Sequence, residues 1–176
     1  DAVASGFNSA GQRCSALRVL CLQEDIADRV LAMLKAAMRE LTIGDPALLP
    51  TDIGPVIDEE AQAGLLAHIE KMRAKGRAVF QLPPPAECAA GCFVPPTLIE
   101  IDSLAVLQGE VFGPVVHVLR YAATGLDALV EAINATGYGL TFGMHSRIGA
   151  QIDAVTRRIR AGNLYVNRNM VGAVVG

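Results

Sequence analysis

The order of local structure along the last third of the chain constrains its fold most strongly. Short, largely apolar runs at residues 115–119, 140–144 and 163–167 are typical of buried strands, and residues 124–135 and 148–160 between them repeat apolar side chains at helical spacing. Strands that alternate with amphipathic helices favour parallel pairing, because each helix returns the chain to the same edge of the sheet. The sequence therefore predicts an α/β fold with a doubly wound, mainly parallel sheet and flanking helices.

The first half of the chain continues this pattern. Residues 17–22 form an apolar run typical of a strand, and Glu24-Asp25 suits the start of a helix. That helix is expected to bury one face, made of Ile26, Val30, Leu34, Ala37, Met38 and Leu41. A second helix is expected to open at Asp58-Glu59-Glu60 and to close at Gly76, with Ala61, Leu65, Ile69 and Met72 on its apolar face.

Three further signals concern loops and helix ends. Residues 83–96 contain five prolines and no apolar period, so we expect a loop that runs over the surface. Thr124 to Asp127 resembles a capping box at the start of the following helix. The glycines of residues 137–143 have the spacing of a nucleotide-binding loop, but they follow a helix and lead into a strand, so a helix cap at Gly137 and a turn at Gly139 explain them better.

Since no composition shift marks an internal boundary, residues 1–176 are predicted to form one domain.

Composition and charge exclude several classes of partner. Of the 176 residues, 52% are hydrophobic and 19% are charged, which favours a folded domain with a substantial core. Fifteen basic residues against 18 acidic ones leave a net charge of −3, so no basic surface for nucleic acid or an anionic membrane is expected. No apolar run approaches the roughly 20 residues of a membrane span, and we expect a cytoplasmic protein. The chain begins with Asp1 and stops inside the apolar, glycine-rich residues 171–176, so we expect it to be truncated at both ends.

The four cysteines do not predict disulfides or a metal site. A chain with a core of this size does not depend on disulfide staples, so we expect reduced thiols. Cys88 and Cys92 have a metal-like spacing, yet the three histidines lie far apart and no second cysteine pair completes a zinc site. We therefore expect no bound metal and interpret this pair as loop cysteines.

Two stretches carry residues that could do chemistry. Cys14 follows the small, flexible residues 7–13 and directly precedes a predicted strand, so its thiol would lie at the edge of a sheet, with backbone amides and Arg13 nearby to favour the thiolate. The second stretch, Glu110-Val-Phe-Gly-Pro114, places a carboxylate and an aromatic ring just before another strand. Taken alone, a free cysteine is usually a packing residue and such an acid usually lies in a plain turn, so the residues leave both readings open.

The motifs around these residues resemble those of the aldehyde dehydrogenase superfamily. The pattern Phe7-x-x-x-Gly-Gln-x-Cys-x-Ala16 is similar to its cysteine signature, and residues 110–114 are similar to its cofactor-binding segment. The resemblance implies that the Cys14 thiolate adds to an aldehyde, that a hydride leaves to NAD, and that water releases the acid. It also implies that the Cys14 backbone amide is half of the oxyanion hole, that Glu110 hydrogen-bonds the nicotinamide ribose, and that Phe112 packs near the nicotinamide ring.

Four longer stretches narrow the resemblance. Residues 11–18, 51–58, 107–114 and 162–176 resemble the L-glutamate γ-semialdehyde dehydrogenase part of bifunctional proline-utilisation enzymes, over essentially the whole chain. This implies an NAD-dependent oxidation of L-glutamate γ-semialdehyde to L-glutamate in proline catabolism, with Ser15 helping to hold the substrate carboxylate, and a homo-oligomeric enzyme. FAD would belong only to a proline dehydrogenase half outside this chain.

Several parts that the family uses are missing from residues 1–176. The general-base glutamate, the oxyanion-hole asparagine, the dinucleotide-binding domain and the loop that completes the substrate pocket have no match here. We therefore expect the remainder of a parent polypeptide to act as partner, and the isolated chain to be inactive. Two alternatives stay open: a dehydrogenase for another aldehyde, and a non-catalytic α/β module that serves only in assembly. The choice between NAD and NADP also stays open.

Overall fold

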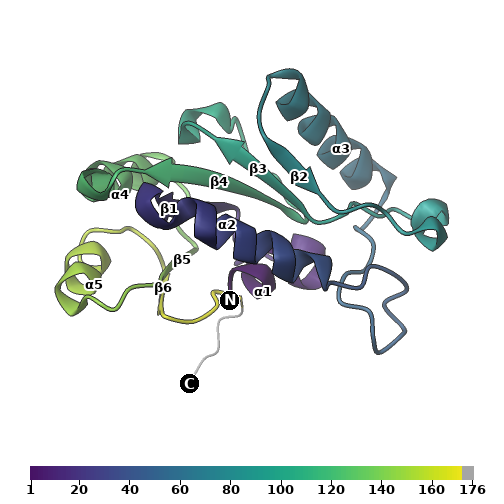
Figure 1. Cartoon of the computed structure of the whole chain (residues 1–176), viewed down its shortest axis with the longest axis horizontal. Helices are drawn as coiled ribbons and strands as arrows, with labels where there is room; N and C mark the ends of the chain where they lie inside the picture. The colour runs from purple at the N-terminus through teal and green to yellow at the C-terminus, as the bar shows by residue number, and fades with distance from the viewer. Residues whose placement is uncertain (172–176) are drawn as a thin grey trace.

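The computed structural model describes residues 1–171, except for the side chain of Glu87, and arranges their strands in two sheets (Figure 1). The larger sheet has the order β1-β4-β3-β2. Strands β1 and β3 both run parallel to β4, whereas β2 is antiparallel to β3. Strands β5 and β6 form a separate parallel pair. The bounds are β1 Val19–Gln23, β2 Val79–Gln81, β3 Thr97–Ile101, β4 Val115–Tyr121, β5 Thr141–Met144 and β6 Asn163–Val166.

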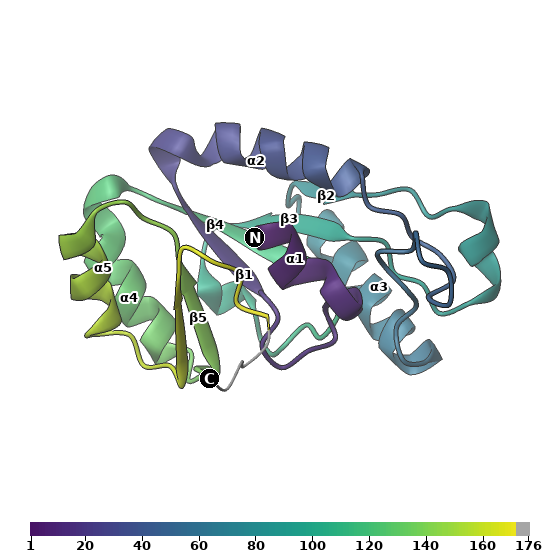
Figure 2. The same ribbon diagram turned by 90° about the horizontal axis from the view of Figure 1, so that it is seen from below.

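Helices lie on both faces of the larger sheet, with α2 above it and α3 below it in Figure 2. Strand β4 shows the reason, because residues three apart on a strand point to opposite faces. His117 contacts His68 of α3, and Arg120 is ion-paired with Asp28 of α2. The expected α/β class with a mainly parallel sheet is therefore confirmed. The helices are α1 Ala2–Phe7, α2 Glu24–Arg39, α3 Glu59–Ala74, α4 Leu126–Ala135 and α5 Gly149–Thr156.

Helix α3 forms as its sequence predicts. The side chain of Asp58 accepts a hydrogen bond from the Ala61 amide at 2.8 Å, which satisfies one of the free amides of the first turn. At the other end Gly76 adopts a φ of +72°, the left-handed conformation that closes many helices. The buried residues Leu65, Ile69 and Met72 face the sheet.

Helix α2 begins at Glu24 as expected but ends at Arg39, before Leu41, and its buried face is rotated from the predicted one. Ala27, Leu31, Leu34 and Met38 are buried, whereas Ile26 is 42% exposed and Ala37 is exposed as well. Apolar residues occur on both candidate faces, so spacing did not choose between them. Ala27 is fully buried, which shows that the small side chain marks the line where the helix lies against the rest of the protein.

Two predictions about helix ends were wrong. The capping box at Thr124 does not form, since α4 begins at Leu126 and Asp127 is ion-paired with Arg158 instead. The last helix ends at Thr156 and not at Arg160. The Asn134 side chain accepts a hydrogen bond from the Arg160 amide at 2.8 Å and donates one to the Arg158 carbonyl at 3.0 Å. These bonds to α4 replace the helical ones.

The proline-rich segment is only partly a surface loop. It contains a short 3₁₀ turn, Ala86–Ala90, and then Val94, Pro95 and Pro96 are buried. The Cys92 carbonyl accepts a hydrogen bond from the Val56 amide at 2.8 Å, and the Phe93 carbonyl accepts one from the Gln62 side chain at 3.0 Å. These partners satisfy the backbone where it turns inward.

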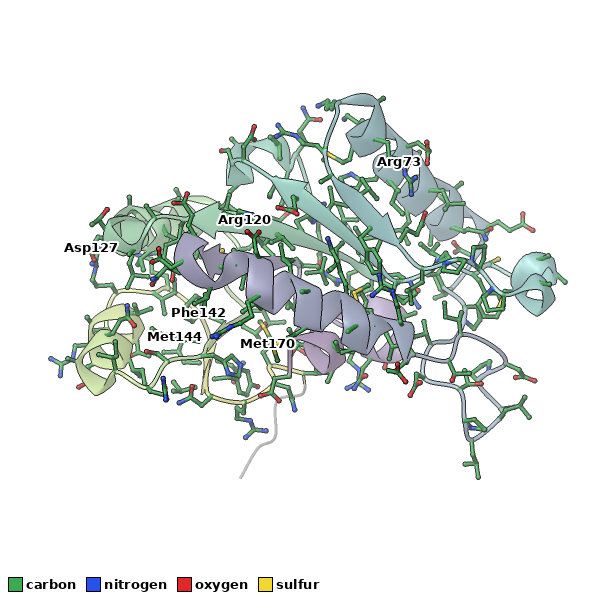
Figure 3. All side chains as sticks on the ribbon, in the orientation of Figure 1. Arg73, Arg120, Asp127, Phe142, Met144 and Met170 are labelled. Atoms are coloured by element: carbon green, nitrogen blue, oxygen red, sulfur yellow. The ribbon has the colours of Figure 1, made fainter. Side chains whose placement is uncertain are left out.

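The core has one large cluster and one small cluster within the described residues. The large cluster joins α2, α3 and the four-stranded sheet. The small one consists of Val130, Val155 and Ile159, against which Phe142 and Met144 of β5 pack (Figure 3). All four cysteines are free. No helix within residues 1–171 is long and apolar enough to cross a bilayer.

The segment between α1 and β1 has an unusual backbone. Ser9, Ala10 and Gly11 adopt φ values of 56°, 52° and 64°, three left-handed residues in succession. For an L-residue other than glycine this conformation costs about 1–2 kcal/mol. Tertiary contacts hold it: Ala10 is 2% exposed, and Gly11 lies so close to Gly113 that an added Cβ would be 2.2 Å from the Gly113 carbonyl oxygen.

Gly11→Ala is expected to lower the free energy of unfolding by about 2–4 kcal/mol, because the new methyl group combines left-handed strain with a clash against backbone. Urea unfolding of the 176-residue chain, followed by circular dichroism, measures this. Gly64→Ala in α3 is the matched control, since its Cβ would meet nothing within 4 Å and the change favours helix. Equal unfolding midpoints for the two variants would contradict the packing of Gly11.

A buried histidine pair links α3 to β4. His117 is 1% exposed, its Nε2 lies 2.9 Å from Nε2 of His68, and its Nδ1 lies 3.3 Å from the Arg18 carbonyl oxygen. Burial, and then the neighbouring His68, lower the pKa of His117 from 6.5 to about 4. Burial and Lys71 also lower the pKa of His68. The native state thus keeps the pair uncharged, whereas the unfolded chain protonates it at mildly acidic pH.

The contribution of His117 to the free energy of unfolding is therefore expected to be fully present above pH 6.5 and to be lost as the pH drops toward about 4. At pH 5 the loss contributed by His117 should be about 2 kcal/mol. His117→Gln should flatten this dependence in urea unfolding measured from pH 5 to pH 7.5. His145→Gln is the control, because the His145 side chain is 54% exposed. An unchanged pH slope in His117→Gln would refute the assignment.

Candidate active site

Cys14 is an accessible thiol on a tight turn. The turn spans residues 13–16 and is closed by a hydrogen bond from the Ala16 amide to the Arg13 carbonyl at 3.0 Å. Cys14 is exposed, whereas Cys88 is buried, and burial raises the pKa of Cys21 to about 12. A cysteine attacks as the exposed thiolate, so Cys14 is the best placed of the four for such chemistry.

Ser15 has a different environment from its neighbour. It is 8% exposed, and its carbonyl accepts a hydrogen bond from the Thr141 hydroxyl at 3.3 Å. The first residue of β5 is therefore hydrogen-bonded to the backbone of the cysteine turn. The structure places Ser15 next to the thiol but largely inside the protein, and its proposed contact with substrate stays a prediction.

Gln12 connects the cysteine turn to the segment before α3. Its side-chain oxygen accepts a hydrogen bond from the Ile57 amide at 2.8 Å, and its side-chain nitrogen lies 3.4 Å from the Pro55 carbonyl oxygen. The motifs at residues 11–18 and 51–58, separate in sequence, are thus neighbours in space. A glutamine suits this position because it offers both a donor and an acceptor to the backbone.

Glu110 and Phe112 lie on the turn that leads into β4. The Glu110 side chain is 40% exposed and Phe112 is 44% exposed. The base of the turn is fixed, because the Pro114 carbonyl accepts from the Thr97 amide at 2.9 Å and Gly113 packs closely against Leu65. Both candidate cofactor-binding residues are therefore presented to solvent on a rigid support.

Arg18 joins the two turns, and sequence reasoning did not single it out. Its Nε donates to Glu110 Oε1 at 3.0 Å, and its Nη1 and Nη2 donate to the carbonyls of Gly11 at 2.6 Å and Arg13 at 3.0 Å. Its guanidinium carbon lies 4.6 Å from the centre of the Phe112 ring. The visible signal was a charged residue within an apolar run that predicts a strand.

The charge of Arg18 is balanced by its neighbours. Burial lowers the pKa of Arg18, while the hydrogen bond to Glu110 and the electrostatic interactions with Glu110 and Cys14 oppose that shift. The carboxylate and the aromatic ring therefore contact one cation, which also binds the backbone just before Cys14. This arrangement can combine a nucleophile with a surface for a ligand that carries hydroxyl groups and a planar ring.

The structure has a cleft away from these residues, and the part of the chain that it describes has no metal-binding group. A cleft of about 680 Å³ opens between residues 42–51 and residues 88–93, and none of the sequence-predicted site residues lines it. Within residues 1–171, no group of three or more His, Cys, Asp or Glu side chains could hold a metal ion. Cys14, Glu110 and Phe112 are each exposed and lie outside this cleft.

The chain matches a known protein family and several known proteins over its whole length. The model of the family described as "Aldehyde dehydrogenase family" matches residues 1–176. The chain is 60% identical to the bifunctional protein PutA of Klebsiella aerogenes, covering 100% of this chain but 14% of that protein. It is 38% identical to 1-pyrroline-5-carboxylate dehydrogenase 1 of Halalkalibacterium halodurans, covering 98% of this chain and 33% of that protein.

Solved structures give the same result. The crystal structure of a bifunctional proline utilization A (PutA) protein superposes with a TM-score of 0.94 at 52% identity, over 100% of this chain and 18% of that one. The chain therefore belongs to the aldehyde dehydrogenase family.

Proposed function

We propose that this chain is the cysteine-bearing part of an NAD-dependent aldehyde dehydrogenase that oxidises L-glutamate γ-semialdehyde to L-glutamate in proline catabolism. The observation that carries the proposal is the single contact network that joins the Cys14 turn to Glu110 and Phe112 through Arg18. The name 1-pyrroline-5-carboxylate dehydrogenase, given to a relative, supports the substrate, because 1-pyrroline-5-carboxylate is the cyclic imine that L-glutamate γ-semialdehyde forms by losing water.

Cys14 is the nucleophile in this proposal. Its thiolate attacks the aldehyde carbon and forms a thiohemiacetal, whose oxyanion is stabilised by the Cys14 amide and by a donor outside this chain. Loss of a hydride then leaves a thioester on Cys14, and water hydrolyses it to the acid. Ser15, next in sequence, is proposed to help hold the substrate carboxylate, since hydroxyl and amide groups donate to anions.

Glu110 and Phe112 fit the cofactor that the family implies. Arg18 occupies Oε1 of Glu110, so Oε2 is left to accept hydrogen bonds from ribose hydroxyls, and the exposed Phe112 ring offers a surface to a planar group. When bound, NAD supplies the acceptor for the hydride. The residues of this chain would hold its ribose and its ring in reach of the Cys14 adduct, which is the condition for fast transfer.

The proposed enzyme needs more than this chain. The matched segment covers 14% of the PutA relative, so the dinucleotide-binding domain, the general base and the remaining pocket residues are proposed to come from the rest of a parent polypeptide. We further propose a homo-oligomer in the cytoplasm that binds no nucleic acid through this segment. If the parent is bifunctional, FAD serves only its proline dehydrogenase half.

Glu110→Gln in the complete enzyme is expected to raise KM for NAD by roughly 10- to 100-fold, because a neutral amide oxygen is a weaker acceptor than a carboxylate. KM for the semialdehyde should change much less. Steady-state kinetics with each substrate varied in turn measure both values.

Cys14→Ser provides the matched control for this experiment. It should abolish turnover while NAD binds with unchanged affinity, because a serine hydroxyl is a far weaker nucleophile than the thiolate at neutral pH. A Glu110→Gln enzyme with normal cofactor kinetics and a lost response to aldehyde would contradict the assigned role of Glu110. Turnover that survives in Cys14→Ser would refute the proposed function.

The isolated 176-residue chain is expected to fold at least in part but not to oxidise aldehydes. Only Glu110 and Phe112 are available to hold the cofactor, and losing a general base typically costs about 10²- to 10⁴-fold. Calorimetry with NAD should therefore show no binding, and the semialdehyde should yield no NADH. Robust turnover by a verified, uncontaminated preparation would contradict this expectation.

A further inference from the structure

We propose that Arg18 is a positioning residue that sets the distance and orientation between the Cys14 turn and the two cofactor-facing residues, Glu110 and Phe112. This inference rests on the proposed function and adds a residue to its site. Arg18 itself need not touch substrate or cofactor. It acts through the groups that it binds.

The contacts of Arg18 divide between the two turns that must meet. Nη2 and Nη1 hold the carbonyls of Arg13 and Gly11, which flank the cysteine turn on its N-terminal side. Nε holds Glu110, 92 residues further along the chain. Because a guanidinium is planar and its donors have fixed directions, the same group that binds one turn determines where the other lies.

The arrangement also leaves the functional atoms available. Nε binds Oε1 of Glu110, so this ion pair fixes the carboxylate while Oε2 stays open to a hydroxyl donor. The guanidinium lies over one face of the Phe112 ring, and the residue is still 44% exposed. One cation thereby orients both groups without blocking them.

Arg18 is anchored more firmly than a surface arginine. Its side chain is 18% exposed, and its own carbonyl accepts a hydrogen bond from the His117 amide of β4 at 2.9 Å. An exposed ion pair contributes little, but a half-buried one with several hydrogen bonds restricts the geometry. The backbone of Arg18 is therefore hydrogen-bonded to the sheet, and its side chain is hydrogen-bonded to both turns.

Double-mutant analysis in the full-length enzyme tests this role. Arg18→Met should raise both KM and Kd for NAD by roughly 10- to 100-fold, yet in a Glu110→Gln background its effect on Kd should be at least roughly threefold smaller, because the part of the effect that acts through Glu110 is already lost. The Kd of Arg18→Lys for NAD should lie between those of wild type and Arg18→Met, since an ammonium keeps the charge but lacks the several fixed donors of a guanidinium. Calorimetry gives Kd without turnover, and thermal unfolding checks that each variant folds.

Arg120→Met is the matched control. Arg120 is likewise a bridging arginine: it pairs with the carboxylates of Asp28 and Glu100, and its side chain is 35% exposed. It lies beside α2 (Figure 3), near the end of β4, whereas Glu110 precedes the start of that strand. Its Kd for NAD should stay within roughly twofold of wild type. A purely structural role for Arg18 predicts additive losses and an equal effect of Glu110→Gln in both backgrounds.

Each outcome decides the matter. If wild type binds NAD and Arg18→Met binds it equally well, or if the losses add, the inference fails while the proposed function stands. If the wild-type full-length enzyme neither binds NAD nor oxidises the semialdehyde, the proposed function fails, and the positioning role fails with it. Should Arg18→Met not fold, Arg18→Lys and its combination with Glu110→Gln carry the same comparison.

Discussion

The parallel pairing of β1 with β4 is the constraint on which the candidate site depends. Val19 lies opposite His117 in this pairing, so the segments that enter the two strands arrive at the same edge of the sheet. The cysteine turn precedes β1 and the Glu110 turn precedes β4. Two motifs that are nearly 100 residues apart therefore meet, because parallel strands share their starting edge. In many open α/β sheets ligands bind at the opposite, carboxyl edge. Here the candidate residues gather at the amino edge.

Burial of β4 makes this pairing secure. Its residues 115–119 are all buried, with α2 on one face and α3 on the other, which is the environment expected of a central parallel strand. His117 is the polar exception, and it is accommodated as an uncharged residue bonded to His68 and to the backbone of Arg18. A chain of contacts thus leads from the histidine pair through the backbone of Arg18, just before β1, to the Arg18 side chain at the site.

The segment that leads into the cysteine turn is held in a backbone conformation that it would not adopt alone. Left-handed values at Ser9 and Ala10 are unfavourable, and they persist because the surrounding structure over-determines them. Gly11 against Gly113, Gln12 against residues 55–57, and Thr141 against the Ser15 carbonyl each fix one side of the turn. A nucleophile on such a support keeps its position without being buried, which combines access with order.

The sequence by itself determined what depends on neighbours along the chain. Spacing and turn chemistry predicted α3 from its Asp58 cap to Gly76, because these features follow from contacts within a few residues. The alternation of strand and helix patterns predicted the class of fold. The resemblance of short motifs also indicated the family that the comparisons bear out. Tertiary structure decided which face of α2 is buried, where α5 ends, and that Arg18 joins the cysteine turn to Glu110 and Phe112. Those outcomes depend on packing and hydrogen bonds between segments distant in sequence, and no local pattern encodes which distant group a side chain will meet.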